Sequence, residues 1–98
     1  MNIQAMMKQA QKMQKDMLKQ KQEIDEKTFE GKSSFVTVTM KGNREVNGVK
    51  IDAESLEKEE IEMLEDMIQV AVNDANSQVE KETEKKLGQY TKGMPGLF

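Results

Sequence analysis

The feature that most constrains this chain is a long helical segment in its C-terminal half. Residues 59–87 contain neither glycine nor proline, and apolar side chains recur along them at steps of three and four residues. The main apolar stripe consists of Ile61, Leu64, Ile68, Ala71, Ala75 and Val79. Further apolar side chains widen this stripe, so residues 67–72 are apolar on most sides of the predicted helix. Such a helix must be covered on two flanks.

The chain has too little apolar material to cover both flanks by itself. Only 36% of its 98 residues are hydrophobic, and it contains one tyrosine, three phenylalanines and no tryptophan. Because small, polar chains commonly complete their burial by oligomerising, we expect an oligomer. We assign its interface to Leu64, Met67, Ile68, Ala71, Val72 and Ala75.

A second helix is predicted from Asn2 to about Asp25, which is also free of glycine. Its apolar positions follow a heptad register in which only one place is polar, at Gln20. The seven places of this seam are Ile3, Met6, Ala10, Met13, Met17, Gln20 and Ile24. A seam of this kind packs against another helix. That helix can belong to the same chain or to a second chain.

Between the two helices the pattern changes to the alternation of β-strands. Residues 35–40 alternate phenylalanine and threonine with valine and methionine. Val46, Val49 and Ile51 mark a second strand. Residues 27–30 are candidates for a short first strand. We therefore expect a small antiparallel meander.

Glycines suggest where these strands turn. Gly42-Asn43 is a hairpin signal, and Gly31 is expected to form a turn before the strand at residues 35–40. Gly48 falls within an odd step of the last strand's apolar pattern, which indicates a β-bulge.

The ends of the long helix have their own signals. Asp52 and Ser55 are candidate N-caps, and Gly88 is expected to end the helix. This divides the chain into a single domain at residues 1–90 and a flexible tail at residues 91–98.

The most distinctive candidate site is a row of lysines in the N-terminal helix. At 100° per residue, Lys8, Lys12, Lys15 and Lys19 fall within an arc of about 60°, nearly opposite the apolar seam. Such a row can neutralise nucleic-acid phosphates without reading bases. The alternative interpretation is an ordinary solvated face.

Charge is divided unequally between the two halves of the chain. Residues 1–50 carry ten basic and six acidic side chains, whereas residues 51–98 carry five and twelve. This asymmetry favours a polyanionic partner for the first half. The net charge of −3 means that any binding must come from a local patch.

The sequence lacks the residues that several classes of function need. Histidine and cysteine are absent, so we expect no catalytic residues and no metal ligands. The acidic run at residues 52–66 lacks the spacing of a calcium loop. We expect no cofactor and no small-molecule substrate. No apolar stretch approaches the roughly 18 residues of a membrane span, and no signal peptide is recognisable, so a cytoplasmic protein is expected.

Four segments resemble a known family in their order along the chain. They are KQAQKMQ at residues 8–14, VKID at 49–52, MLEDMIQVAVNDA at 63–75 and GMPG at 93–96. Together they are similar to the YbaB/EbfC family of bacterial nucleoid-associated proteins.

The resemblance implies a helix, a three-stranded antiparallel sheet and a long helix, paired as a tweezer-like homodimer. It also implies contacts with duplex DNA from the ends of the first and last helices. In this chain the corresponding residues are Lys8, Gln11, Lys12, Lys15, Lys19, Lys81, Lys85 and Lys86. The final three are assigned by region, and their acidic neighbours also fit an ordinary helix surface, in which Glu82 and Lys86 form an i,i+4 pair.

We therefore expect an α+β homodimer that binds double-stranded DNA with low sequence specificity. A location on the nucleoid and effects on nucleoid organisation and gene expression follow from that expectation. The main alternative is a protein-binding adaptor or holdase whose Met-rich helix faces hold client proteins. Membrane binding by the first helix is a weaker alternative, because no aromatic residue precedes Phe29.

Overall fold

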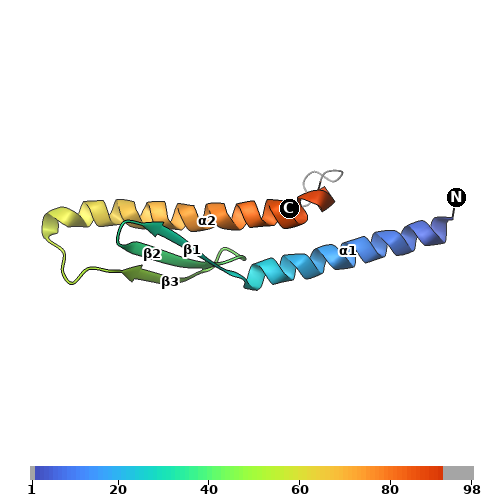
Figure 1. The fold of residues 1–98 in the computed structure, drawn as a ribbon, viewed down its shortest axis with the longest axis horizontal. Helices are drawn as coiled ribbons and strands as arrows, with labels where there is room; N and C mark the ends of the chain where they lie inside the picture. The colour runs from blue at the N-terminus through green and yellow to red at the C-terminus, as the bar shows by residue number, and fades with distance from the viewer. Residues whose placement is uncertain (1, 92–98) are drawn as a thin grey trace.

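The computed structural model describes residues 2–91, so all of the expected tail at residues 91–98 except Thr91 lies outside the described part. The molecule is elongated, with Cα extents of 71 by 21 by 14 Å, and both helices run along its length (Figure 1). Its elements are α1 (Ile3–Glu26), β1 (Thr28–Ser33), β2 (Val36–Lys41), β3 (Val46–Ile51), a 3₁₀ turn (Lys58–Glu60) and α2 (Ile61–Thr91). The expected helix, three-stranded sheet and long helix are confirmed.

The sheet is an antiparallel meander in the order β1-β2-β3. Thr39 pairs with Gly48 and Met40 pairs with Val46, which leaves Asn47 as the extra residue of a bulge. The predicted bulge is therefore present in β3. A turn at Gly42 and Asn43 joins β2 to β3, as the sequence indicates.

Gly31 does not form the predicted turn. It lies inside β1, paired with Val38, and the chain turns at Ser34 and Phe35 instead. A Cβ atom at residue 31 would lie 2.0 Å from the carbonyl oxygen of Ala71 and 2.9 Å from Cβ of Ala75. Glycine is needed there because it lets the backbone of β1 touch α2 directly.

The core lies between α2 and one face of β1 and β2. Val36 and Val38 pack against Ala71, while Phe29 and Met40 pack with Ala75 and Val79 of the next turns. The β2 side chains in this core are at most 3% exposed. Each large apolar side chain buried in this way stabilises the fold by roughly 1.5–3 kcal/mol.

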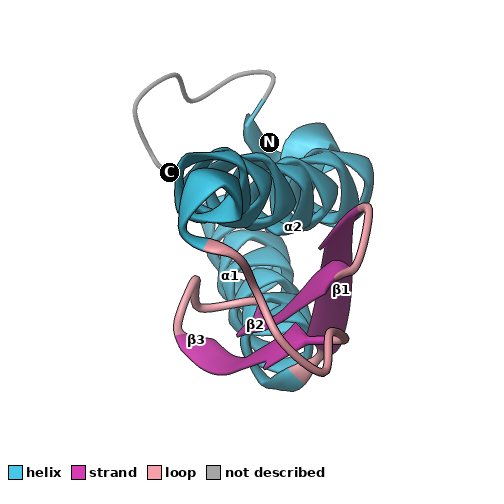
Figure 2. Ribbon diagram, turned by 90° about the vertical axis from the view of Figure 1, so that its left-hand side faces the viewer, coloured by secondary structure: helices cyan, strands magenta, loops and turns pink. Residues whose placement is uncertain are grey.

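Strand β3 is not covered by α2. Figure 2 shows β1 rising toward α2 and β3 at the far side of the sheet. Val46, Val49 and Ile51 pair with the buried residues of β2 and so point to the same face of the sheet. They are nevertheless 42%, 48% and 39% exposed. The sheet therefore keeps an open apolar strip beside the covered one.

The boundaries of α2 differ from those predicted. The helix continues through Gly88 to Thr91, so the prediction that Gly88 ends it is wrong. Leu87, only 1% exposed, anchors this last part of the helix. Neither Asp52 nor Ser55 caps the start. The 3₁₀ turn that leads into α2 has Glu57 as its N-cap, and the backbone N–H of Glu57 donates to the carboxylate of Glu60 at 3.2 Å.

Helix α1 extends away from the rest of the molecule (Figure 1). It begins where Oδ1 of Asn2 accepts a hydrogen bond from the backbone N–H of Ala5 at 3.3 Å. Residues 3–16 are exposed throughout, and Ile24 is the only buried residue of the helix. The seam therefore has a partner only toward the end of α1.

We predict that Gly31→Ala destabilises the protein. The added methyl group must displace the backbone of α2 at Ala71, and overpacking of this kind costs about 1–3 kcal/mol. Gly48→Ala is the matched control, because its Cβ would meet Thr39 at an ordinary 3.7 Å. Urea unfolding followed by circular dichroism measures both. Equal midpoints for the two variants would refute the close contact between β1 and α2.

Candidate nucleic-acid interface

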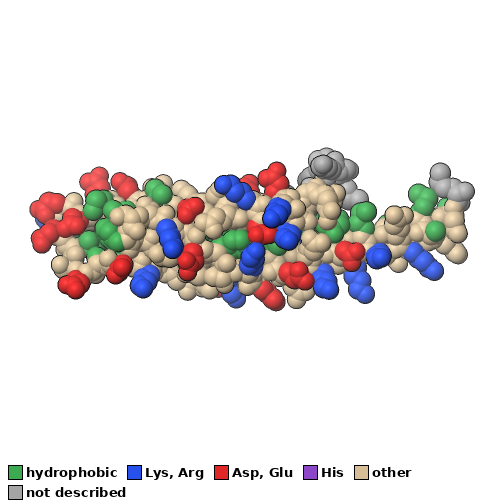
Figure 3. Space-filling view, in the orientation of Figure 1, with side chains coloured by type: hydrophobic (Ala, Val, Ile, Leu, Met, Phe, Trp, Pro, Cys, Tyr) green, Lys and Arg blue, Asp and Glu red, His purple; other side chains and the backbone are tan. Residues whose placement is uncertain are grey.

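The four lysines of the predicted row are all exposed on α1. Their spacing keeps them on one side of the helix, and three of them lie in the part of α1 whose every residue is exposed. Figure 3 shows basic side chains along this extending helix, with acidic side chains gathered at the opposite end of the molecule. The charge asymmetry of the sequence is thus also an asymmetry in space. Gln11, also exposed, lies one residue before Lys12.

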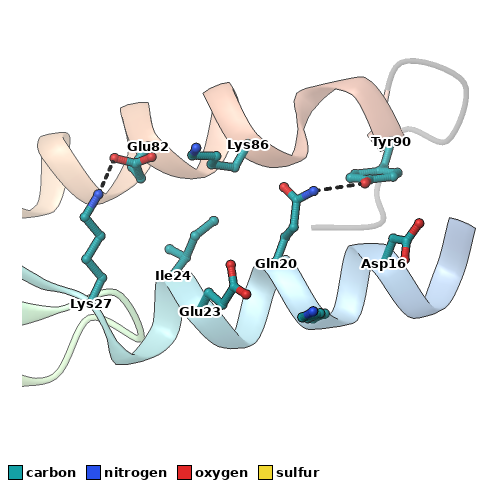
Figure 4. Close-up of a pocket in the computed structure, with 9 residues that line it drawn as sticks. Asp16, Gln20, Glu23, Ile24, Lys27, Glu82, Lys86 and Tyr90 are labelled. Carbon is teal, nitrogen blue, oxygen red and sulfur yellow. Dashed lines mark hydrogen bonds and ion pairs between the residues drawn. The ribbon is translucent and has the colours of Figure 1, made fainter.

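A cleft of about 600 Å³ separates the end of α1 from the end of α2 (Figure 4). It brings Lys19 of the predicted row together with Lys86 of the second predicted group. The lining also includes the carboxylates of Asp16, Glu23 and Glu82. The cleft therefore carries both signs of charge and is not a uniformly basic groove.

Lys27 and Glu82 form an ion pair across one end of this cleft. The lysine Nζ lies 3.0 Å from Oε2 of Glu82, whose side chain is 19% exposed. The hydrogen bond from Lys27 lowers the pKa of Glu82 below its ordinary value of 4.5, and the charges of Lys27, Lys86 and Lys85 lower it further. Lys27 also lies 5.6 Å from the centre of the Phe29 ring. It thus joins the end of α1 to both β1 and α2.

Gln20 and Tyr90 join the helices at the other end of the cleft (Figure 4). Nε2 of Gln20 donates a hydrogen bond to the tyrosine hydroxyl at 3.2 Å, in a partly buried setting. Gln20 is the single polar place in the apolar seam of α1. Its partner on α2 explains why a polar side chain is tolerated at that place.

The structure does not bring the three C-terminal lysines together. Lys81 and Lys85 line a hollow beside Lys27 and Phe29, whereas Lys86 lines the cleft. All three are exposed. They therefore present charge in two directions from α2.

The six residues assigned to a dimer interface divide into two groups. Ala71 and Ala75 are 0% exposed against the chain's own sheet, so they have no surface left for a second chain. The other four are partly buried beside that core, and they are Leu64, Met67, Ile68 and Val72.

Ile68 and Val72 lie on the flank of α2 that is turned toward the uncovered strand. At 100° per residue this flank also carries Asn76. Asn76 accepts a hydrogen bond from Arg44, which lies in the β2–β3 connection. The apolar strip of β3 and this flank of α2 therefore lie toward the same side of the molecule.

Sequence reasoning missed Lys27 and Tyr90 as residues that organise this region. No local pattern identifies either one, because their partners lie 55 and 70 residues away in the chain. Only the polar interruption of the seam at Gln20 pointed to an unusual contact.

Between residues 2 and 91, no three acidic side chains lie close enough together to hold a metal ion. Within the same range, neither helix has an apolar stretch long enough to cross a bilayer.

The fold is a helix–sheet–helix arrangement whose first helix extends from the molecule (Figure 1) and carries a row of exposed lysines. Residues 1–94 match the model of the YbaB/EbfC DNA-binding family. The chain therefore belongs to the YbaB/EbfC DNA-binding family, which confirms the resemblance seen in its motifs.

Relatives from several bacteria match this chain over nearly its whole length. A nucleoid-associated protein of Lactococcus lactis subsp. cremoris (strain MG1363) is 50% identical over 97 residues, covering 97% of this chain and 98% of that protein. A nucleoid-associated protein of Enterococcus faecalis (strain ATCC 700802 / V583) is 47% identical over 98 residues, covering 98% of this chain and 94% of that protein. A nucleoid-associated protein of Alkaliphilus metalliredigens (strain QYMF) is 43% identical over 101 residues, covering 99% of this chain and 89% of that protein.

We predict that the ion pair of Glu82 contributes stability that is lost in acid. Because its pKa is lowered in the folded state, the contribution is present above the ordinary value and disappears as the pH falls through the folded value. At neutral pH, Glu82→Gln should lower the free energy of unfolding by up to about 1 kcal/mol, since Lys27 is half exposed. Urea unfolding at pH 7 and at pH 3 measures the difference.

The control for this experiment is Glu80→Gln, at an exposed position of the same helix. It should leave the pH dependence close to that of the unmodified protein. A Glu82→Gln variant with an unchanged pH dependence would show that the pair contributes nothing.

Proposed function

We propose that this protein binds duplex DNA mainly through phosphate contacts and with low sequence specificity. The observation that supports this most directly is the row of four exposed lysines on a helix that extends from the molecule. An extended helix can lie against a duplex without obstruction from the sheet. Membership of a DNA-binding family supports the same function.

The proposed mechanism is the release of condensed counterions. Each lysine that approaches a phosphate displaces part of the cation atmosphere of DNA, which makes binding favourable and dependent on salt. Flexible ammonium groups position the protein on the backbone and read no bases. Any preference among sequences would come from DNA shape or deformability.

The acidic end of the molecule supports a defined orientation on DNA. Glu57, Glu59, Glu62 and Glu65 are exposed around the start of α2, far from the free end of α1 (Figure 1). Phosphates repel these carboxylates, so DNA would be directed toward α1. Lys81, Lys85 and Lys86, nearer to α1, are proposed as secondary contacts.

We also propose that the protein acts as a homodimer, joined along the uncovered face of β3. Val46, Val49 and Ile51 are exposed on β3, and Ile68 and Val72 are partly buried on the flank of α2 that is turned toward this strand. A second copy would bury this strip and place a second lysine row on the same assembly. Two such arms are consistent with a tweezer-like shape.

The proposed location follows from this binding. A DNA-binding homodimer of low specificity would be found on the nucleoid in the cytoplasm, and the names of its relatives also point to the nucleoid. Effects on nucleoid organisation and gene expression would follow from occupancy of many sites.

A protein-binding adaptor or holdase is the second candidate. Met6, Met7 and Met13 are 54%, 57% and 48% exposed on the extending helix, and flexible methionines suit varied apolar partners. Binding through these side chains would persist at high salt, in contrast to phosphate binding.

For the DNA proposal, we predict that replacing Lys8, Lys12, Lys15 and Lys19 with glutamine weakens binding to random-sequence duplex. If all four lysines of both subunits contact phosphates, the slope of log affinity against log salt is roughly −7 in the unmodified protein. It should be much shallower in the variant, in which only the proposed secondary contacts of Lys81, Lys85 and Lys86 remain. Fluorescence anisotropy of labelled DNA across a salt series measures both slopes.

The matched control replaces four lysines outside the row, namely Lys32, Lys41, Lys50 and Lys58. It changes the net charge equally and should retain most of the slope. Equal losses in the two variants would contradict the site assignment, and absence of binding by the unmodified protein at low salt would favour the adaptor function.

For the homodimer, we predict that Val49→Glu produces a monomer at micromolar concentration, because it places a charge in the centre of the apolar strip. Val70→Glu is the control. Val70 is similarly exposed, at 54%, but lies on the flank of α2 where Asp74 contacts β1. Sedimentation velocity should show a dimer for this control, and a dimer for both variants would contradict the proposed interface.

A further inference from the structure

Helix α1 is held to the rest of the molecule only near its C-terminal end. Ile24 is buried between the helices and the β2–β3 turn, where a Cβ atom on Gly42 would overlap the backbone of Ile24. Between residues 17 and 23 only Met17 and Gln20 are partly covered, and residues 3–16 are exposed. The direction of this free segment must therefore be set by the few contacts around Ile24.

Two polar contacts cross between the helices on either side of Ile24. They are Gln20 with Tyr90 and Lys27 with Glu82, and we call them together the α1–α2 brace. The two contacts are separated by seven residues along α1 and eight along α2, or about 10–12 Å on each helix. Because the helices run antiparallel (Figure 1), the contacts form two matched links across the cleft in Figure 4.

Two separated links define a direction, whereas one link allows the helix to pivot. Without the link at Tyr90, α1 would be free to tilt about Ile24 and Lys27. Lys8 lies sixteen residues from Ile24, or about 24 Å along the helix. A tilt of about 10° would therefore move its backbone by about 4 Å, which is as long as an ion pair.

The place of Gln20 in the seam supports a directing role for this link. An apolar side chain there would complete the seam and add burial. A single polar side chain at a seam position specifies register and partner at a cost in stability. Gln20 has such a partner in the hydroxyl of Tyr90.

We propose that Tyr90 is a positioning residue for DNA binding, which through its hydrogen bond to Gln20 fixes the direction of α1 and so the placement of Lys8 and Lys12. This rests on the proposed function of the lysine row. The hydroxyl acts at a distance and does not itself touch DNA.

The first experiment measures the direction of α1 without DNA. The chain contains no cysteine, so cysteines introduced at the exposed positions Gln4 and Glu80 can carry a unique pair of spin labels. Labelled chains are diluted with unlabelled protein so that each assembly holds one pair. The distance distribution should be narrow in the otherwise unmodified protein and distinctly broader with Tyr90→Phe, which removes only the hydroxyl.

Two further variants separate this role from general stability. Gln20→Met should broaden the distribution as Tyr90→Phe does, whereas Gln20→Glu should keep it narrow because its carboxylate can accept from the tyrosine hydroxyl. Gln78→Met is the matched control. It removes a 2.7 Å hydrogen bond from a glutamine of α2 to the carbonyl of Glu30, and should leave the direction of α1 unchanged.

The second experiment measures DNA binding by the unlabelled Tyr90→Phe and Gln78→Met proteins across a salt series. Loss of Lys8 and Lys12 contacts in both subunits would reduce the slope of log affinity against log salt by up to about 4 units. Gln78→Met should retain the full slope. An unchanged slope or an unchanged distance distribution for Tyr90→Phe overturns the proposal.

These results distinguish the two proposals. If the unmodified protein binds DNA with a steep slope and Tyr90→Phe does the same, the positioning role is wrong and the DNA function stands. If the unmodified protein does not bind DNA, the proposed function is wrong and the role of Tyr90 in DNA binding falls with it. The distance distribution then still decides whether Tyr90 directs α1.

Discussion

The direct contact between β1 and α2 at Gly31 is the constraint on which the rest of the structure depends. Because Gly31 has no side chain and Ala71 and Ala75 have small ones, the backbones of β1 and α2 come into contact. This contact places α2 over β1 and β2, so β3 lies beyond its cover (Figure 2). The same placement aligns the end of α2 with the end of α1. The open apolar strip and the cleft between the helices thus share one origin.

Local patterns predict most of the elements because each element has its own periodicity. The 3.6-residue spacing identified both helices, and the alternation at residues 35–40 identified the central strand, which the structure places at Val36–Lys41. Two of the glycine predictions, those for Gly31 and Gly88, failed for a common reason. Gly31 and Gly88 were interpreted as local turn and end signals, but Gly31 serves a tertiary contact, and Gly88 follows Leu87, whose burial continues the helix. A single sequence does not separate these uses of glycine.

In the candidate site, too, local patterns predict some features, whereas others depend on tertiary contacts. The lysine row follows from helical geometry alone, because its members are neighbours in the chain. The links of Gln20 and Lys27 depend on where two helices approach each other, which no periodicity specifies. The burial of Ala71 and Ala75 inside the chain likewise depends on which flank of α2 meets the sheet. Sequence reasoning therefore recovered the charges of the site and missed the contacts that orient them.

The exposure of residues 3–16 has a consequence for how this protein can change. These residues add almost nothing to the buried core, so substitutions there leave the free energy of folding nearly unaltered provided the helix is kept. Under the proposed function, the affinity of residues 3–16 for DNA can accordingly be raised or lowered by ordinary point changes, without compensating changes elsewhere. The architecture thus separates the part of the chain that must fold from the part that is free to adapt.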